Sequence, residues 1–94
     1  MADLLEEKDL ERLAKKVPEW EIDETVISRT YEFDEFSQSI DFVNDVSEIA
    51  EEAQHHPEIL IQFTTVTISS TTHDEGGLTS LDFDLATKID NLVD

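Results

Sequence analysis

Residues 58–72 read EILIQFTTVTISSTT, and this segment decides the fold. It is rich in Thr, Val and Ile, whose β-branched side chains favour strands because they pack well on a pleated surface. Val66 and Ile68 alternate with polar residues, so we expect both in the core together with Leu60. The same alternation places His73 on the face opposite Val66 and Ile68, away from the main apolar layer.

A long helix is expected before this segment, over residues 35–54, with Asp34 as its N-cap. The helix must end near His55 and His56, because the residue before Pro57 is pushed out of the α region. Its apolar and small residues recur at helical spacing and define the face expected to pack on the sheet: Phe36, Ile40, Val43, Val46, Ser47, Ile49, Ala50 and Ala53.

Two short strands are expected between residues 20 and 33, with a turn near Asp23 and Glu24. From Ile27 onwards the pattern changes to period two, which is typical of a half-buried strand. One face of this strand would carry Ile27, Arg29, Tyr31 and Phe33.

Helices are also expected at both ends of the chain. The first covers about residues 5–16 and is stopped by Pro18, and the last begins at the capping pattern of Thr79 and Asp82. Its expected buried stripe is Leu81, Leu85, Ile89 and Leu92. The order helix, two strands, helix, strand region, helix predicts an α+β fold in which helices cover one face of an antiparallel sheet.

Length and charge limit the possible functions. The 94 residues are expected to form one domain, 1–94. Because a net charge of −18 repels phosphate backbones and anionic lipid, no nucleic-acid or membrane partner is expected. Such acidity suits a salt-rich cytoplasm, where salt screens self-repulsion. The lack of cysteine and of a long apolar run predicts a cytoplasmic protein without disulfides.

All three histidines of the chain lie within residues 55–73. Histidine has an unperturbed pKa near neutrality, so clustered imidazoles are a natural site of proton transfer, although a lone histidine is more often structural. Zinc binding is the alternative, with Glu51 or Asp74 as additional ligands. Adjacent histidines rarely converge on one ion, so we expect neither a metal nor a cofactor.

The run from Glu51 to Asp82 resembles the signature of the pterin-4a-carbinolamine dehydratases, also called 4a-hydroxytetrahydrobiopterin dehydratases. That signature is a charged residue, three positions, His-His-Pro, an aromatic residue after five more, a histidine after nine and then an aspartate. Here these positions hold Glu51, His55, His56, Pro57, Phe63, His73 and Asp82. Similar blocks outside the signature extend the resemblance from about Leu5 to Leu92.

The resemblance implies a four-stranded antiparallel sheet with three helices packed on one face, in a homodimer or homotetramer. It implies a hydro-lyase that dehydrates 4a-hydroxytetrahydropterin to quinonoid dihydropterin and water during tetrahydropterin recycling. The catalytic acids and bases would be His55, His56 and His73. The residues expected to bind the pterin are Glu51, Pro57, Phe63, Thr72, Asp74 and Asp82. Asp82 is also expected to order the start of the last helix, and Glu51 to orient an imidazole or meet the amide edge of the pterin.

Two other functions stay open on the sequence. Relatives of the family also act as dimerisation cofactors for a transcription factor, through a helix surface that would here be residues 35–54. Dehydratase-like proteins also resemble proteins linked to molybdopterin metabolism, whose ligand would be a modified pterin. Either function would keep the fold and change the role of the histidines.

Overall fold

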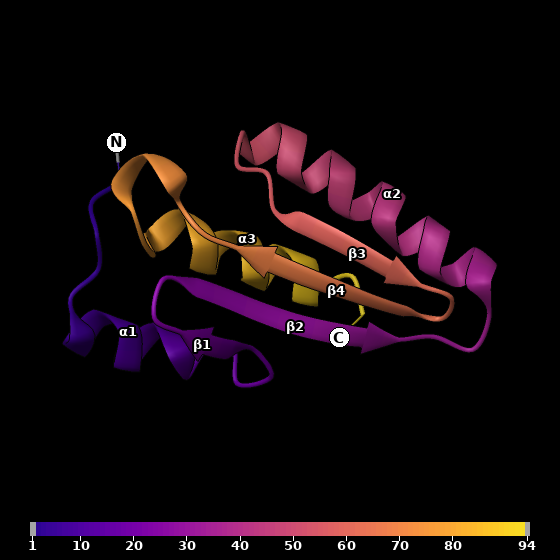
Figure 1. Cartoon of the computed structure of the whole chain (residues 1–94), viewed down its shortest axis with the longest axis horizontal. Coiled ribbons are helices and arrows are strands. Elements are labelled where there is room, and N and C mark those ends of the chain that lie inside the picture. The colour runs from indigo at the N-terminus through magenta and orange to yellow at the C-terminus, as the bar shows by residue number, and fades with distance from the viewer. Residues whose placement is uncertain (1, 94) are drawn as a thin grey trace.

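Along the chain the elements are α1 (Glu7–Ala14), β1 (Glu21–Asp23), β2 (Val26–Glu32), α2 (Phe36–Ala53), β3 (Glu58–Gln62), β4 (Thr65–Ser70), the short 3-10 helix η1 (His73–Glu75) and α3 (Ser80–Asp90). The structure is a computed structural model that describes residues 2–93. The strands form an antiparallel sheet in the order β1-β2-β4-β3. Figure 1 shows that α2 and α3 run behind the length of the sheet.

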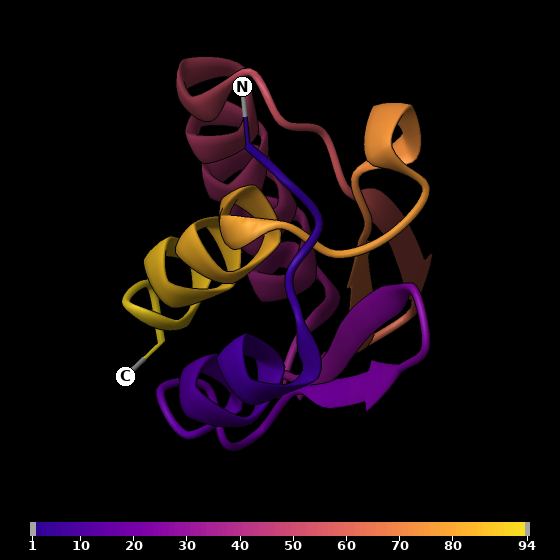
Figure 2. The ribbon, with the colours of Figure 1, turned by 90° about the vertical axis from the view of Figure 1, so that its left-hand side faces the viewer.

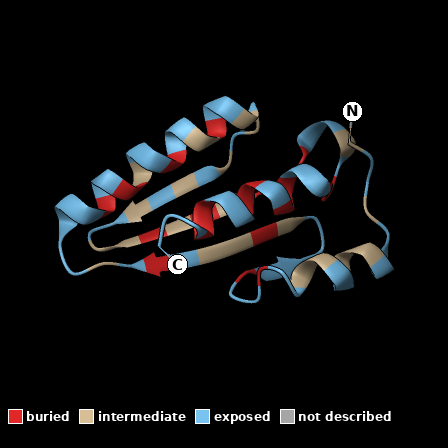
Figure 3. Cartoon of the chain, turned by 180° about the vertical axis from the view of Figure 1, so that it is seen from behind, coloured by how far each residue is buried: buried red, intermediate tan, exposed pale blue. Residues whose placement is uncertain are grey.

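The three α-helices of the described chain lie on one side of the sheet, and the other side is open (Figure 2). This confirms the predicted α+β fold. Ile27, Val66 and Ile68 of the sheet are fully buried against Val46 and Ile89 of the helices. The buried residues therefore gather between the two layers (Figure 3). Within residues 2–93, none of the helices is long and apolar enough to cross a bilayer.

The segment 58–72 forms a hairpin and not one strand region. Phe63 lies in the turn between β3 and β4 with φ 55°, in the left-handed region. Glycine and asparagine favour that conformation, and neither occurs here, so the turn carries no sequence signal. The turn leaves Leu60 on the open face, 54% exposed, and the prediction that Leu60 lies in the core was wrong.

The buried face of α2 is rotated from the predicted one. Its N-cap is Glu35 instead of Asp34, because the Gln38 side chain accepts hydrogen bonds from the backbone N–H groups of both residues at 3.0 Å. Phe36 and Ile40 are exposed, at 50% and 36%. The buried residues are Ser39, Phe42, Val46 and Ala50. The small side chains of Ser39 and Ala50 let the helix approach the sheet closely. The spacing of the large apolar residues alone does not predict this buried face.

In α3 the prediction was right for Leu85 and Ile89, which are fully buried, and wrong for Leu81 and Leu92. Leu81 is 38% exposed beside the buried stripe, and Leu92 is 40% exposed because α3 ends before it, at Asp90. The true stripe includes Phe83, Ala86 and Asp82. Asp82 is fully buried on this face of the helix, and the candidate site is arranged around its carboxylate.

The C-terminal end of α3 is tied to the sheet by Asp90. Its Oδ1 atom accepts hydrogen bonds from Trp20 Nε1 at 2.9 Å, Tyr31 Oη at 2.7 Å and Arg29 Nη1 at 2.7 Å. The Arg29 guanidinium also lies 4.4 Å from the centre of the Tyr31 ring. One carboxylate thereby joins α3, β2 and the segment that follows α1.

Replacing Asp90 by Ala should lower the free energy of unfolding by about 3 kcal/mol, because it removes the carboxylate that accepts hydrogen bonds from Trp20, Arg29 and Tyr31. Urea unfolding measures the change. Asp84→Ala is the matched control, since Asp84 is exposed on the same helix and its loss should change stability by less than about 0.5 kcal/mol. Equal stability of the two variants would contradict the role given to Asp90.

Candidate active site

The three histidines meet at one end of the sheet. After α2, Gln54 adopts the left-handed conformation with φ 52° and turns the chain, and His55 N–H then donates to Ala50 O at 3.1 Å. Pro57 directs the chain into β3. Next to β3, β4 runs back to the same end and leads into η1, which begins at His73 (Figure 1). The left-handed Gln54 and the antiparallel hairpin together bring His55 and His56 towards His73.

The two segments border an open depression of about 230 Å³, which we call the histidine cleft. It is lined by Gln54, His55, His56, Thr71, Thr72, His73 and Asp74. Five of the predicted residues therefore lie around one cleft: His55, His56, Thr72, His73 and Asp74. Gln54 and Thr71 also line the cleft but were not predicted, because their only signal in the sequence is their position next to residues of the motif.

Asp82 lies beneath the histidine cleft with no exposed surface. Its Oδ2 atom accepts hydrogen bonds from Thr72 Oγ1 at 2.8 Å and from the Thr79 backbone N–H at 3.0 Å. Its Oδ1 atom accepts one from Ser70 Oγ at 2.6 Å and lies 2.6 Å from His55 Nε2. A buried carboxylate is stable when it is so fully hydrogen-bonded. Asp82 also completes the capping box of α3, as predicted from Thr79 and Asp82.

The contact with Asp82 fixes the His55 imidazole. With three donors already directed at it, the carboxylate acts as an acceptor, so His55 Nε2 carries the hydrogen and donates. The other ring nitrogen, Nδ1, is then the unprotonated one. The His55 side chain is 10% exposed, so its ring has little freedom to turn. Fixing one ring nitrogen of a histidine in this way determines which atom is free for proton transfer.

His56 is held more loosely. Its Nε2 atom contacts Glu51 Oε2 in the last turn of α2, and the two side chains are 62% and 72% exposed. Glu51 therefore contacts an imidazole, and its expected role in orienting that ring stays a prediction. His73 and Asp74 are exposed on the opposite border of the cleft. The site thus offers one rigid imidazole and two that can adjust to a ligand.

Four predicted pterin-binding residues lie outside the lining of the cleft: Glu51 and Asp82, which contact its histidines, and Pro57 and Phe63. Pro57 is half-buried just beyond His56, where its role is to direct the chain. Phe63 is 73% exposed at the opposite end of the sheet, where Phe33 N–H donates to Thr64 O at 2.8 Å. The five residues of β3 separate Phe63 from Pro57, which corresponds to about 20 Å of extended chain. Within one chain, Phe63 and the histidines do not meet.

Among residues 2–93, no three histidine, aspartate or glutamate side chains converge as ligands of one ion would. His55 and His56 each direct Nε2 at a different carboxylate, Asp82 below the cleft and Glu51 beside it. Adjacent histidines that diverge in this way leave a zinc ion without a tetrahedral set of ligands.

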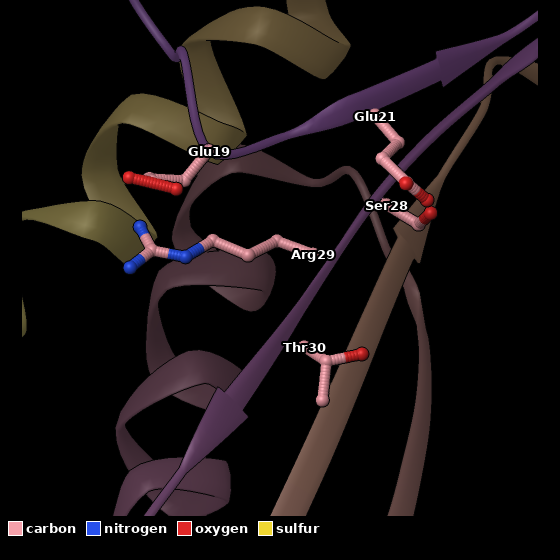
Figure 4. Close-up of a pocket in the computed structure, with 5 residues that line it drawn as sticks. All are labelled: Glu19, Glu21, Ser28, Arg29 and Thr30. Carbon is pink, nitrogen blue, oxygen red and sulfur yellow. The ribbon is translucent and has the colours of Figure 1, made fainter.

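A larger depression, of about 340 Å³, lies on the other side of the molecule beside β1 and β2. Figure 4 shows Arg29 reaching towards α3 on the same side as Glu19, whereas Glu21 and Ser28 point to the other side of the strand. Its one cation is already bound to Asp90, and no histidine lines it. The larger volume therefore does not identify this depression as the active site, and the histidine cleft is the better candidate active site.

Replacing Asp82 by Asn should lower the free energy of unfolding by about 2–4 kcal/mol. The Asn side chain places an NH₂ donor where one carboxylate oxygen of Asp82 accepts hydrogen bonds, so the buried donors on that side lose their acceptor. Urea unfolding measures the loss. Asp74→Asn is the matched control, since Asp74 is exposed at the same cleft and should leave stability unchanged. A stability loss for Asp74→Asn as large as for Asp82→Asn would rule out the anchoring described here.

Comparison with known proteins gives one consistent result. The family model described as pterin 4 alpha carbinolamine dehydratase matches residues 3–92. A protein from Picosynechococcus sp., provisionally named a pterin-4-alpha-carbinolamine dehydratase, is 45% identical over 98% of this chain and 100% of its own length. One from Sulfurisphaera tokodaii with the same provisional name is 39% identical, covering 95% and 96%.

Solved structures agree on the fold. The crystal structure of a transcriptional coactivator/pterin dehydratase from Brucella melitensis matches with a TM-score of 0.92 and 28% identity, covering 98% of this chain and 100% of that one. A pterin dehydratase-like protein identified as a RuBisCO assembly factor in the alpha-carboxysome matches with a TM-score of 0.64 and 20% identity, covering 78% and 84%. That second likeness concerns the fold alone.

Proposed function

Since the chain belongs to the pterin 4 alpha carbinolamine dehydratase family, we propose that it is a hydro-lyase acting on 4a-hydroxytetrahydropterins. The product would be the quinonoid dihydropterin, returned to the tetrahydropterin pool by a later reduction. The observation that supports this proposal is the gathering of all three histidines around one cleft, with one of them anchored to a buried carboxylate.

The reaction needs proton transfer and no redox step. The hydroxyl group on C4a accepts a proton and leaves as water, which breaks the C4a–O bond. The proton on N5 is removed, and its electron pair forms the N5–C4a double bond. One proton enters and one leaves, so imidazoles can supply both the acid and the base. The mechanism therefore calls on no cofactor and no metal.

The three imidazoles differ in how they are held, and this suits a pair of opposite proton transfers. We place His55 and His56 at the reacting carbon, where one of them protonates the 4a-hydroxyl group. His73, on the opposite border, holds that hydroxyl or acts as the complementary base. Preorganised groups lower the cost of reaching the transition state, which favours a role at the reacting atoms for the rigid His55. Glu51 orients His56, and Asp82 acts through His55.

The fold alone does not decide between catalysis and a binding role. The family's fold also occurs in the RuBisCO assembly factor, which shares 20% identity with this chain. A pterin-binding or molybdopterin-related protein could use the same cleft for recognition only. The decisive difference lies in whether removal of an imidazole abolishes turnover or merely weakens binding.

Single replacements His55→Ala, His56→Ala and His73→Ala should each lower kcat for loss of 4a-hydroxytetrahydropterin by about 10²–10⁴-fold, the usual contribution of a general acid or base. Stopped-flow ultraviolet absorbance measures turnover. Because the net charge is −18, both molar KCl and dilute buffer should be used. Gln62→Ala, exposed at the far end of β3, is the control and should keep full activity.

Unchanged turnover in all three histidine variants would contradict this mechanism. A folded wild type that binds a dihydropterin but gives no acceleration would favour the recognition role instead. Circular dichroism of each variant separates lost chemistry from lost folding.

A further inference from the structure

The chain before α1 runs over the loop that carries His73. Leu5 N–H donates to Leu78 O at 3.0 Å, and the half-buried Leu5 side chain packs against the hydrophobic core. Leu4 covers the buried Gly77 so closely that a Cβ atom on Gly77 would lie 3.0 Å from Leu4 Cδ2. Figure 2 shows this indigo segment crossing the connection between η1 and α3. We call residues 4 and 5 the N-terminal strap.

The loop beneath the strap joins β4 to α3. It closes on itself, since Thr72 N–H donates to Gly77 O at 3.0 Å and Gly76 turns the chain back with φ 74°. Glycine adopts that left-handed conformation easily because it has no Cβ atom. The base of the loop is fixed by the hydrogen bond from Thr72 to Asp82. Its tip, which carries His73, is exposed, and exposed tips of this kind are the first parts of a fold to open.

The turn between β1 and β2 supports the same loop from another direction. Thr71, which lines the histidine cleft, donates its hydroxyl hydrogen to Thr25 O at 2.5 Å. Thr25 Cγ2 also lies 3.8 Å from the position that a Cβ atom on Gly77 would take. Gly77 therefore lies between two segments from the first third of the chain, and neither segment belongs to the His-His-Pro motif.

The two sides of the histidine cleft depend on different supports. His55 is held by Asp82 below the cleft, so its ring stays fixed by contacts that do not involve the strap. The exposed His73 side chain takes its position from the backbone of the loop. The separation of these two imidazoles therefore depends on how well the loop is held. A displacement of about 1 Å between reacting groups can cost about 10²-fold in rate.

We propose that the N-terminal strap positions His73 opposite His55, which makes Leu4 and Leu5 positioning residues of the histidine cleft. This inference rests on the proposed function. The strap acts through the backbone of Gly77 and Leu78. Leu4 itself is 52% exposed and contributes little to the core, so its loss should leave the fold intact and let the loop open more often.

Amide hydrogen exchange tests the contact without any substrate. The N–H groups of Gly76 and Gly77 donate to Thr72 O within the loop, whereas His55 N–H belongs to the end of α2. Leu4→Ala should speed the exchange of both glycine N–H groups about tenfold or more and leave that of His55 unchanged.

Leu92→Ala is the matched control for exchange, because Leu92 is 40% exposed beyond the other end of α3. It should leave the exchange of Gly76 and Gly77 at the wild-type rate. If Leu4→Ala speeds exchange at His55 as much as at the glycines, or at neither, the role of the strap is overturned.

Turnover in molar KCl tests the positioning itself. Leu4→Ala should lower kcat about tenfold with little change in KM, because the substrate still meets the anchored His55 while His73 is in place for less of the time. Leu92→Ala should keep the wild-type kcat. An unchanged kcat in Leu4→Ala, with a loop that exchanges faster, would show that the strap does not position His73.

A double-mutant cycle connects the effect to the contact between Leu4 and Gly77. Gly77→Ala should push the Leu4 side chain away and lower kcat by itself, since the added Cβ atom would lie 3.0 Å from Leu4 Cδ2. In the Leu4→Ala background the same change should lower kcat no further. Losses that simply multiply would show that the two residues act independently, against the proposal.

If wild type gives no acceleration, the proposed function fails, and titration with 7,8-dihydropterin then tests the strap. Affinity that is several-fold weaker in Leu4→Ala than in Leu92→Ala supports the strap. Wild-type affinity in both variants would overturn it.

Discussion

The buried Asp82 carboxylate is the interaction on which the site depends. It caps α3 through the Thr79 backbone, holds the end of β4 through Ser70 and Thr72, and fixes His55. These groups come from three separate parts of the chain. A charge in the interior costs several kcal/mol unless it is fully hydrogen-bonded, so they stay in place together or not at all. The position of the rigid imidazole is thereby coupled to the start of α3 and to the end of the sheet.

The proposed function rests on a difference between the histidines. His55 is nearly buried and held by Asp82, whereas His56 and His73 are exposed at the surface of the cleft. Acid and base in one reaction require different environments, and the fold supplies them at a single end of the sheet. Asp90 stabilises the other end of α3 through Trp20, Arg29 and Tyr31. The helix that carries Asp82 is therefore fixed at both ends.

Most of the fold and the grouping of the histidines could be predicted from the sequence, because helix stops, caps and the His-His-Pro motif are local signals. The β3–β4 turn could not, since Phe63 adopts a left-handed conformation that its residue type does not favour. The buried face of α2 was misjudged because Ser39 is buried and Ile40 is not. The contact between Asp82 and His55 joins residues far apart in sequence, and only tertiary packing determines it. The oligomeric state stays a prediction.

The state of the His55 ring tests the role of Asp82 most directly. Nitrogen-15 NMR of labelled wild-type protein distinguishes a protonated from an unprotonated ring nitrogen in each histidine. For neutral His55 we predict a single tautomer, with hydrogen on Nε2 and an unprotonated Nδ1, while the exposed His73 averages between tautomers. A neutral His55 with hydrogen on Nδ1, or one that averages as His73 does, would contradict the anchoring of the site by Asp82.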